Sequence, residues 1–243
     1  MNLARKKNQE DKIYKTIIIG FGKIAASYAN DKKMSSYFNY STHIQVLSDH
    51  PKFHVKAVVD PNKEALFNAK TNWGIPETAF SLDELEDLNQ FEIAILAIPP
   101  EDRLKIILKL PKLKGLVIEK PLANNLKEAN EIIKICRERD ILVQVNFTRR
   151  FDKKMIEIKN NLNEYFGDIQ ASFGIYGNGL NNNGSHLIDW SRMYLGEVNW
   201  VQSISKKDFK NDISIKKDIN LSFVLGFKTG LKIFVQAIDF DKY

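Results

Sequence analysis

The sequence predicts an α/β protein of two domains: a doubly wound parallel sheet, followed by an α+β domain with an open, mainly antiparallel sheet. Strand-like and helix-like segments alternate up to about residue 146, as in a parallel sheet with helical crossovers. Residues 91–98 form an almost continuous apolar run, which is typical of a strand buried on both faces. After residue 146 the strands follow one another with short turns, so we expect domains at 1–146 and 147–243.

The elements of the first domain follow from its apolar runs and turn residues. A polar stretch at 30–36 interrupts the helix expected after residue 25. Ser81 and Glu84 have the spacing of a capping box at a helix start. We expect strands at about 14–19, 55–60, 91–98, 115–119 and 141–146. We expect helices at about 42–48, 63–71, 82–88, 101–110 and 125–139.

The second domain has a different pattern. A Gly- and Asn-rich loop at 177–183 precedes a helix-like segment, and Gly230 marks a tight turn between the last two strands. We expect helices at 152–165 and 185–195, and strands at about 169–176, 200–205, 219–227 and 231–238. This domain is expected to carry a substrate site or an oligomer contact.

Composition places the chain among ordinary soluble globular proteins, with 44% hydrophobic and 27% charged residues. The net charge of +6 is spread out, and no basic face is interleaved with aromatic residues, so an anionic small molecule is a better partner than nucleic acid. The one cysteine, Cys136, excludes an intrachain disulfide and is expected to be a packed thiol. We expect no metal site. No apolar run spans a membrane and the polar start is no signal peptide, so we expect a cytoplasmic protein.

A glycine-rich turn is the strongest single motif. Residues 16–25 read Thr-Ile-Ile-Ile-Gly-Phe-Gly-Lys-Ile-Ala, a strand that runs into the pattern Gly-x-Gly-x-x-Ala. Such a strand–turn–helix normally holds a dinucleotide pyrophosphate, although an ordinary turn without a ligand is the other interpretation. Gly20 allows the sharp turn, Gly22 lets the backbone approach the phosphates, and Ala25 lets the helix pack closely. The cofactor-binding candidates here are Gly20, Phe21, Gly22, Lys23, Ile24 and Ala25.

Asp60 closes the next strand and is the expected partner of the adenosine ribose. In the usual fingerprint this carboxylate follows the glycines by about 20 residues. Here the separation is roughly doubled, so we expect an insertion in the connection. A carboxylate at this position accepts hydrogen bonds from ribose hydroxyls and repels a 2′-phosphate, which favours NAD. Lys63 softens this preference, so NADP stays open.

Two strand ends bring further candidates to the edge at which an open α/β sheet binds its ligand. Lys120, in the sequence Glu119-Lys120-Pro121, directly follows a buried strand. A desolvated lysine there can give or take a proton near neutral pH, and a surface lysine at a loop entrance is the alternative. Pro99 ends the preceding strand and is expected to shape the floor near the nicotinamide ribose.

The second domain adds an arginine pair and a histidine. Arg149 and Arg150 suit a phosphate or carboxylate, or else they belong to a solvated hinge. His186 lies on the first turn of a helix, and imidazole is well suited to taking a hydroxyl proton at neutral pH; a structural histidine is the alternative. Asp189, three residues on, could orient the ring, hold the backbone or cap the helix start.

In their order along the chain, these motifs resemble those of the Gfo/Idh/MocA family, the relatives of glucose–fructose oxidoreductase and inositol dehydrogenase. The motifs are Gly-x-Gly-x-x-Ala, Asp-Pro after the second strand, Ala-x-Pro at a strand end, Glu-Lys-Pro, Asn-x-x-Arg-Arg and Gly-Ser-His-x-x-Asp. The resemblance implies a Rossmann domain with an open-sheet domain, and NAD(P)-dependent hydride transfer at a hydroxyl-bearing carbon of a sugar, cyclitol or sugar nucleotide. It makes Lys120 the catalytic lysine and His186 the residue that exchanges the hydroxyl proton. It also implies a cis Lys120–Pro121 peptide and a homo-oligomer, a dimer or tetramer.

Two departures from the family pattern concern the second domain. Many members have an aspartate four residues before the histidine, where this chain has Asn182. An amide cannot take up a proton, so the relay would run through Lys120 and His186, and Asn182 would hydrogen-bond a sugar hydroxyl. Members usually continue beyond the last strand expected here, so we expect a shortened or incomplete second domain.

The sequence thus predicts an NAD(P)-dependent sugar or polyol oxidoreductase, with the substrate hydroxyl between Lys120 and His186. The catalytic candidates are Lys120, His186 and Asn182, the substrate-binding candidates are Arg149, Arg150, Asn182 and His186, and Asp60, Pro99, Glu119 and Lys120 join the glycine turn in binding the cofactor. One alternative is a catalytically impaired dinucleotide-binding homologue that acts as a sensor or partner subunit. The other is a structural α/β domain with an empty cleft.

Overall fold

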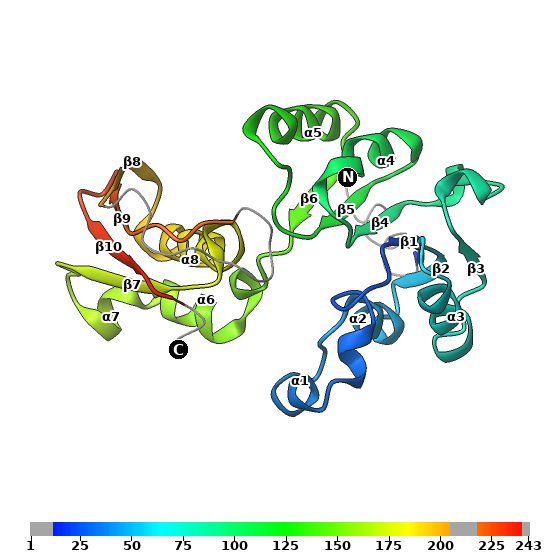
Figure 1. Cartoon of the computed structure of the whole chain (residues 1–243), viewed down its shortest axis with the longest axis horizontal. Coiled ribbons are helices and arrows are strands. Elements are labelled where there is room, and N and C mark those ends of the chain that lie inside the picture. The colour runs from blue at the N-terminus through cyan, green and yellow to red at the C-terminus, as the bar shows by residue number, and fades with distance from the viewer. Residues whose placement is uncertain (1–11, 205–217, 240–243) are drawn as a thin grey trace, which may run out of the picture. The chain divides into compact units, whose positions relative to one another are not determined.

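The chain divides into two compact units, Met1–Asn146 and Phe147–Tyr243 (Figure 1). The computed structural model describes residues 12–204 and 218–239. Residue 205, the last of the strand expected at 200–205, lies outside the described residues.

The six strands of the first unit all run parallel, in the order β3-β2-β1-β4-β5-β6, which confirms the predicted doubly wound sheet. The strands are β1 (Tyr14–Ile19), β2 (Phe53–Val59), β3 (Glu77–Ala79), β4 (Ile93–Leu96), β5 (Gly115–Ile118) and β6 (Leu142–Val145). The sequence missed β3 because three residues are too few to form an apolar run. Strand order reverses between β1 and β4, and the ligand crevice of an open α/β sheet lies at the carboxyl ends of the strands at such a point.

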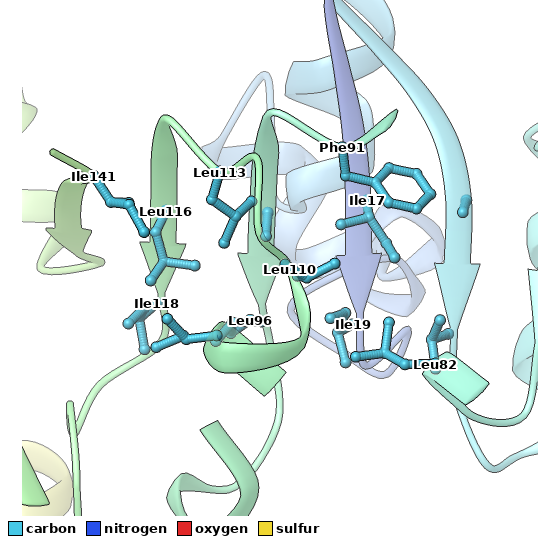
Figure 2. Close-up of a cluster of buried hydrophobic side chains, with 14 of the residues drawn as sticks. Ile17, Ile19, Leu82, Phe91, Leu96, Leu110, Leu113, Leu116, Ile118 and Ile141 are labelled. Atoms are coloured by element: carbon cyan, nitrogen blue, oxygen red, sulfur yellow. The ribbon is translucent and has the colours of Figure 1, made fainter. Parts of the chain in front are cut away.

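Helices cover both faces of this sheet (Figure 1). On one face, α4 (Arg103–Lys109) and α5 (Leu126–Glu138) pack against the strands. Figure 2 shows side chains from neighbouring strands of this cluster, among them Ile17, Leu96 and Leu116. On the other face, α2 (His43–Asp49) and α3 (Lys63–Asn72) pack on the sheet in a second buried cluster. A sheet buried on both faces explains why the strand at 91–98 reads as a continuous apolar run.

Helix α5 shows how the local sequence determines where a helix begins and which of its residues are buried. The side chain of Asn125 caps the helix by accepting a hydrogen bond from the backbone N–H of Glu128 at 3.0 Å. Ile132 and Cys136, one helical turn apart, are its buried residues. Cys136 is therefore a packed thiol, as expected, and burial raises its pKa.

The segment after the glycine turn explains the long distance to Asp60. A 3₁₀-helix (Ser27–Asn30) and α1 (Lys32–Tyr37) follow the turn, so the expected interruption is present, but most of the polar stretch at 30–36 is itself helical. It forms a helix because Asp31 caps the backbone N–H groups of the next turn. The backbone N–H groups of His43 and Ile44, at the start of α2, then donate to the carbonyls of Ile24 and Ala25. Helix α2 therefore continues the turn begun at Gly22, and residues 27–41 are the insertion.

Two other expected elements differ. The helix expected at 82–88 is replaced by two 3₁₀ turns, Leu82–Glu84 and Leu88–Gln90. Ser81 makes no capping bond, and Glu84 instead accepts from the backbone N–H of Phe80 at 2.9 Å. The capping box is wrong because Leu82 is the one buried residue of its turn, which is too little apolar surface to hold a longer helix. The helix expected at 101–110 begins with a 3₁₀ turn, Pro100–Asp102.

The second unit is built on a four-stranded sheet with the order β7-β10-β9-β8. Its strands are β7 (Ser172–Tyr176), β8 (Val198–Ser203), β9 (Phe223–Phe227) and β10 (Lys232–Ala237). The β8–β9 and β9–β10 pairs are antiparallel and the β7–β10 pair is parallel, so the mainly antiparallel sheet is confirmed. Helix α8 (Ser185–Leu195) packs its Leu187 and Leu195 against one face. The helix expected at 152–165 is divided at Asn161 into α6 (Lys153–Asn160) and α7 (Leu162–Phe166).

Exposed apolar side chains lie on two adjacent strands of this sheet. Phe173 and Ile175 of β7 and Phe234 of β10 are exposed, and the rings of Phe173 and Phe234 are stacked with centroids 5.8 Å apart. Such a face is compatible with a contact between copies of the chain, and the homo-oligomer stays a prediction.

Candidate functional site

The turn after β1 has the shape that a glycine-rich phosphate loop requires. Gly20 has a φ of +85°, and a Cβ at this position would lie 2.5 Å from the carbonyl oxygen of Ala97. Its N–H donates to the carbonyl of Val59 at 2.8 Å. Glycine at this position is therefore required by the tight turn and by the end of the neighbouring strand.

Gly22 is glycine for a different reason. A Cβ at Gly22 would meet no atom within 4 Å, and Gly22 and Lys23 are exposed. Within the described part of the chain, the backbone N–H groups of Gly22, Lys23 and Ile24 donate no hydrogen bond. Open space beside unpartnered N–H groups is the arrangement that holds a phosphate. Ala25 is fully buried and packs in the cluster that contains α2.

Asp60, directly after β2, is tied to this turn. Its carboxylate accepts from the backbone N–H of Phe21 at 2.6 Å and from that of Asn62 at 2.8 Å. The side chain is buried, so part of its role is to fix the end of β2 against the glycine turn. A carboxylate has about four acceptor positions, and hydrogen bonding to a ribose stays a prediction.

Glu119, after β5, is the centre of a small polar cluster. One oxygen of its carboxylate, Oε1, accepts from Nε2 of His43 at 2.8 Å and from Nδ2 of Asn146 at 2.7 Å. Burial by itself raises the pKa of Glu119, but the hydrogen bonds and the charges of His43 and Lys120 outweigh it, and the pKa is lowered. The carboxylate therefore stays ionised beside Lys120 and links the start of α2 to the ends of β5 and β6.

Arg103 is a buried residue of this edge that the sequence did not reveal. Its guanidinium donates to the carbonyls of Ile98 (2.5 Å) and Glu119 (2.7 Å), and also to those of Pro121 and Leu122. Burial lowers its pKa to about 10, so it keeps its charge at neutral pH. It joins the segments that follow β4 and β5, and thereby fixes the backbone on both sides of Lys120. The Lys120–Pro121 peptide is cis, as expected, and Lys120 is partly buried.

The second unit contains a pocket of about 480 Å³ that includes two of the expected site residues. Arg149 and His186 line it together with Tyr176, Asn183 and Trp190. Neither Asn182 nor Arg150 is among its lining residues, so the lining asparagine is the neighbour of the expected one. The ring of His186 meets that of Phe147 edge-on, with centroids 5.6 Å apart. The pocket brings together a cation, an imidazole and an amide with aromatic and aliphatic surface, a composition common in small-molecule sites.

Arg150 has a partner inside the second unit. Its Nε lies 2.8 Å from both carboxylate oxygens of Asp189, and Nη2 donates to the carbonyl of Asp189 at 3.3 Å. Asp189 thus pairs with Arg150. This differs from the three roles considered for Asp189, which were to orient the His186 ring, to hold the backbone or to cap the helix. The pair ties the 3₁₀ turn Thr148–Phe151, which precedes α6, to α8, and the substrate-binding role of Arg150 stays a prediction.

The residues before His186 form a π-helical turn, Gly179–Gly184, where the sequence suggested an open loop. The turn runs directly into α8, and His186 is the second residue of that helix. Buried side chains near the start of β9 hold the turn: Asp218 accepts from the N–H groups of Asn181 and Asn182, and Asn220 from that of Gly179. No sequence signal pointed to their burial, because polar residues that alternate with apolar ones are expected on the solvent face of a strand.

Two features are absent from the described residues. Within residues 12–204 and 218–239, no three His, Cys, Asp or Glu side chains gather as a metal site needs. Among the same residues, no helix has the length and hydropathy to cross a membrane.

Solved structures with the same fold are numerous. An oxidoreductase from Agrobacterium radiobacter, in complex with NAD+, L-tartaric acid and magnesium, matches with a TM-score of 0.73 and 17% identity, over 91% of this chain and 65% of its own. GenD2 from gentamicin A biosynthesis, in complex with NAD, matches with a TM-score of 0.72 and 16% identity, over 93% and 66%. Apo scyllo-inositol dehydrogenase from Lactobacillus casei matches with a TM-score of 0.69 and 16% identity, over 94% and 70%. The chain therefore spans about two thirds of the length of these proteins, and at this identity the likeness shows the fold.

Sequence comparison shows the family. A comparison with curated proteins gives no match. The family model described as an oxidoreductase family with an NAD-binding Rossmann fold matches residues 14–147, more than half of the chain. That region contains the glycine turn, Asp60, Pro99, Glu119 and Lys120. The chain belongs to the Gfo/Idh/MocA family of NAD-binding oxidoreductases.

Proposed function

We propose that the chain binds NAD(H) at the glycine turn of its first unit and oxidises or reduces a hydroxyl-bearing carbon of a sugar, cyclitol or sugar nucleotide. The observation that carries this proposal is the turn itself. An exposed Gly22 with open space beside it is followed by N–H groups that donate to no described residue, in a region that matches an NAD-binding family. The inositol dehydrogenase from Lactobacillus casei supports a cyclitol or sugar as the substrate class.

Different residues of the first unit bind different parts of the dinucleotide. The N–H groups of Gly22, Lys23 and Ile24 hold the pyrophosphate. Asp60 accepts from the adenosine ribose with acceptor capacity that its two backbone partners leave unused. The same buried carboxylate disfavours a 2′-phosphate, so NAD is preferred to NADP. Pro99 and Glu119 contact the nicotinamide half.

The reaction needs proton transfer from the protein. Bound NAD+ would supply the hydride acceptor. His186 takes the hydroxyl proton, because a partly buried imidazole lies on the wall of the pocket and imidazole is well suited to general base catalysis. Lys120 donates a hydrogen bond to the reacting oxygen and stabilises the negative charge that develops there as the proton leaves for His186. Arg149, which lines the pocket of His186, binds a phosphate or hydroxyl of the substrate.

A dinucleotide sensor or partner subunit without turnover is the competing function. It is favoured by Asn182, an amide four residues before His186 that does not line the pocket. In that case the glycine turn would still bind NAD(H) and no hydroxyl compound would be oxidised.

Titration with NADH and NADPH, followed by nicotinamide fluorescence, tests the proposal. We expect micromolar binding of NADH and weaker binding of NADPH. Gly22→Asp should abolish binding, because it places a carboxylate where the pyrophosphate lies and meets no protein atom. Ser36→Asp adds the same charge on the exposed α1 and should bind normally. Binding with turnover in a screen of polyols and sugar nucleotides supports the oxidoreductase, binding without turnover supports the sensor, and a folded protein that binds neither nucleotide overturns both.

A further inference from the structure

Three polar side chains near the start of β9 are buried in a way that the sequence pattern does not suggest. Asp218, Asn220 and Ser222 alternate with apolar residues, yet they are 5%, 0% and 3% exposed, whereas Ile219 between them is 37% exposed. We call these three residues the polar row. Burying polar groups is unfavourable unless each one is hydrogen-bonded. The partners of the polar row therefore show what it stabilises.

Asp218 holds the turn that leads to His186. Its Oδ1 accepts from the N–H of Asn181 and its Oδ2 from that of Asn182, both at 2.9 Å. Hydrogen bonds to a carboxylate are about twice as strong as those between neutral groups. Gly179 has a φ of +90°, and a Cβ at this position would overlap the carboxylate of Asp218. The Asp218 carboxylate packs so closely against the turn at 179–184 that position 179 has no room for a side chain.

The other two residues hold a second wall of the same pocket. Asn220 accepts from the N–H of Gly179 at 2.9 Å and donates to the carbonyl of Ile238 at 3.3 Å. Ser222 accepts from the N–H of Ala237 at 3.0 Å. Ile238 lines the pocket that contains His186. The polar row thus connects the turn at 179–184 to the end of β10.

We infer that the polar row positions His186 and Asn183, and that Asp218 is its principal member. The structural part of this inference depends on hydrogen bonds within the second unit alone; its effect on catalysis rests on the proposed function. Because the turn runs without a break into α8, movement of residues 181 and 182 would move Asn183 and the imidazole of His186 together. None of the three residues lines the pocket, so they act through the residues that do.

Backbone hydrogen exchange tests the positioning directly and needs no substrate. In Asp218→Asn the side-chain NH₂ faces one of the two N–H groups, so one hydrogen bond is lost. We expect exchange at residue 181 or 182 to become at least about tenfold faster, as for the loss of a bond to a charged group. Asp168→Asn makes the same change at an exposed position of the second unit and should leave both residues unchanged. Unchanged exchange in a folded Asp218→Asn would overturn the inference.

A second variant keeps the test decisive if Asp218→Asn does not fold. Gly179→Ala pushes the carboxylate away from the turn without removing it, and the same N–H groups should then exchange faster. The chain has four histidines, so NMR titration of their rings adds a readout that general loosening would not produce. We expect the ring signal absent from His186→Asn to shift in Asp218→Asn, with the other three unmoved. Shifts spread over all four histidines would contradict a positioning role.

Kinetics then separate the inference from the proposed function. If the chain turns over a hydroxyl compound, Asp218→Asn should lower kcat and alter its pH profile, and NADH affinity should stay at the wild-type value because the glycine turn lies in the first unit. If the wild-type chain does not bind NADH, the proposed function fails, and the exchange and ring-signal results still decide whether the polar row positions His186.

Discussion

The two units each contain a glycine-rich turn that runs toward a helix, and the two turns do opposite things with their N–H groups. In the first, the N–H groups of Gly22, Lys23 and Ile24 donate to no described residue, and the space beside Gly22 is open. In the second, the N–H groups of Asn181 and Asn182 are both bound by Asp218. The first turn is suited to binding an anion from outside, and the second, which has its own carboxylate, is suited to presenting the residues that follow it.

Glycine itself has a different role in each turn. At Gly20 and Gly179 a side chain would collide with the protein, whereas at Gly22 it would meet nothing. The structure therefore requires glycine at the first two positions, whereas at Gly22 no protein atom does, and a ligand requirement there stays a prediction. The partner of each N–H group, rather than the number of glycines, distinguishes a binding turn from a positioning turn.

The largest expected effect is a loss of turnover when the catalytic candidate of either unit is replaced. Lys120→Ala and His186→Asn should each lower kcat by about 10²–10⁴-fold, the contribution typical of a general acid or base. NADH affinity should stay within about twofold in both, because neither variant changes the glycine turn. Wild-type turnover in either variant would remove that residue from the mechanism. A large loss of NADH affinity in either variant would show that the replaced residue also takes part in binding the cofactor.

The buried Arg103 gives the next largest effect. In Arg103→Lys a single ammonium replaces a guanidinium that donates to four carbonyls, so carbonyls at the ends of β4 and β5 lose their donors. We expect the free energy of unfolding, measured in urea, to fall by about 2–4 kcal/mol. Lys105→Arg, on the exposed side of α4, is the control. A loss below about 0.5 kcal/mol would mean that water replaces the guanidinium without penalty.

Replacing Gly20 or Gly22 by alanine compares a glycine that the fold requires with one that we expect only the ligand to require. Gly20→Ala should lower the free energy of unfolding by about 2–4 kcal/mol, because of the positive φ and the clash with Ala97. Gly22→Ala should change it by less than about 0.5 kcal/mol and still weaken NADH binding by about tenfold. Equal losses of stability in the two variants would remove the distinction.

The smallest effect is the dependence of stability on pH at Glu119. Its folded pKa is lowered, so its stabilising contribution is present above the ordinary carboxyl value of 4.5 and is lost as pH falls through the folded value. Glu119→Gln should flatten the loss of stability between roughly pH 5 and pH 3. Glu86→Gln, an exposed carboxylate in the same unit, should leave that slope unchanged. An unaltered slope in Glu119→Gln would show that the His43 and Asn146 bonds contribute nothing.

The insertion at 27–41 shows what sequence spacing can and cannot reveal. The distance from Gly20 to Asp60 indicated extra residues, and the structure contains them between the glycine turn and α2. Their helical conformation was not predicted, since α1 forms at 32–37 in a segment with no apolar periodicity. A six-residue helix depends on its cap and its surroundings more than on propensity. The helix predicted at 82–88 does not form, although its residues are good helix formers, because they have almost no apolar surface to bury.

By itself the sequence determined the two fold classes and the glycine turn after β1, because these depend on local pattern: apolar runs, turn residues, and motif spacing along the chain. The site roles of Asp60, Lys120 and His186 stay predictions. Tertiary structure alone decided that Asp189 pairs with Arg150, that Asn183 rather than Asn182 lines the pocket, and that Arg103 and Asp218 hold the backbone around the site. The last two are buried charges, and a sequence pattern places them on the surface because charged residues are mostly exposed. They are stable inside because backbone groups far away in the chain satisfy them, Glu119 for Arg103 and Asn182 for Asp218.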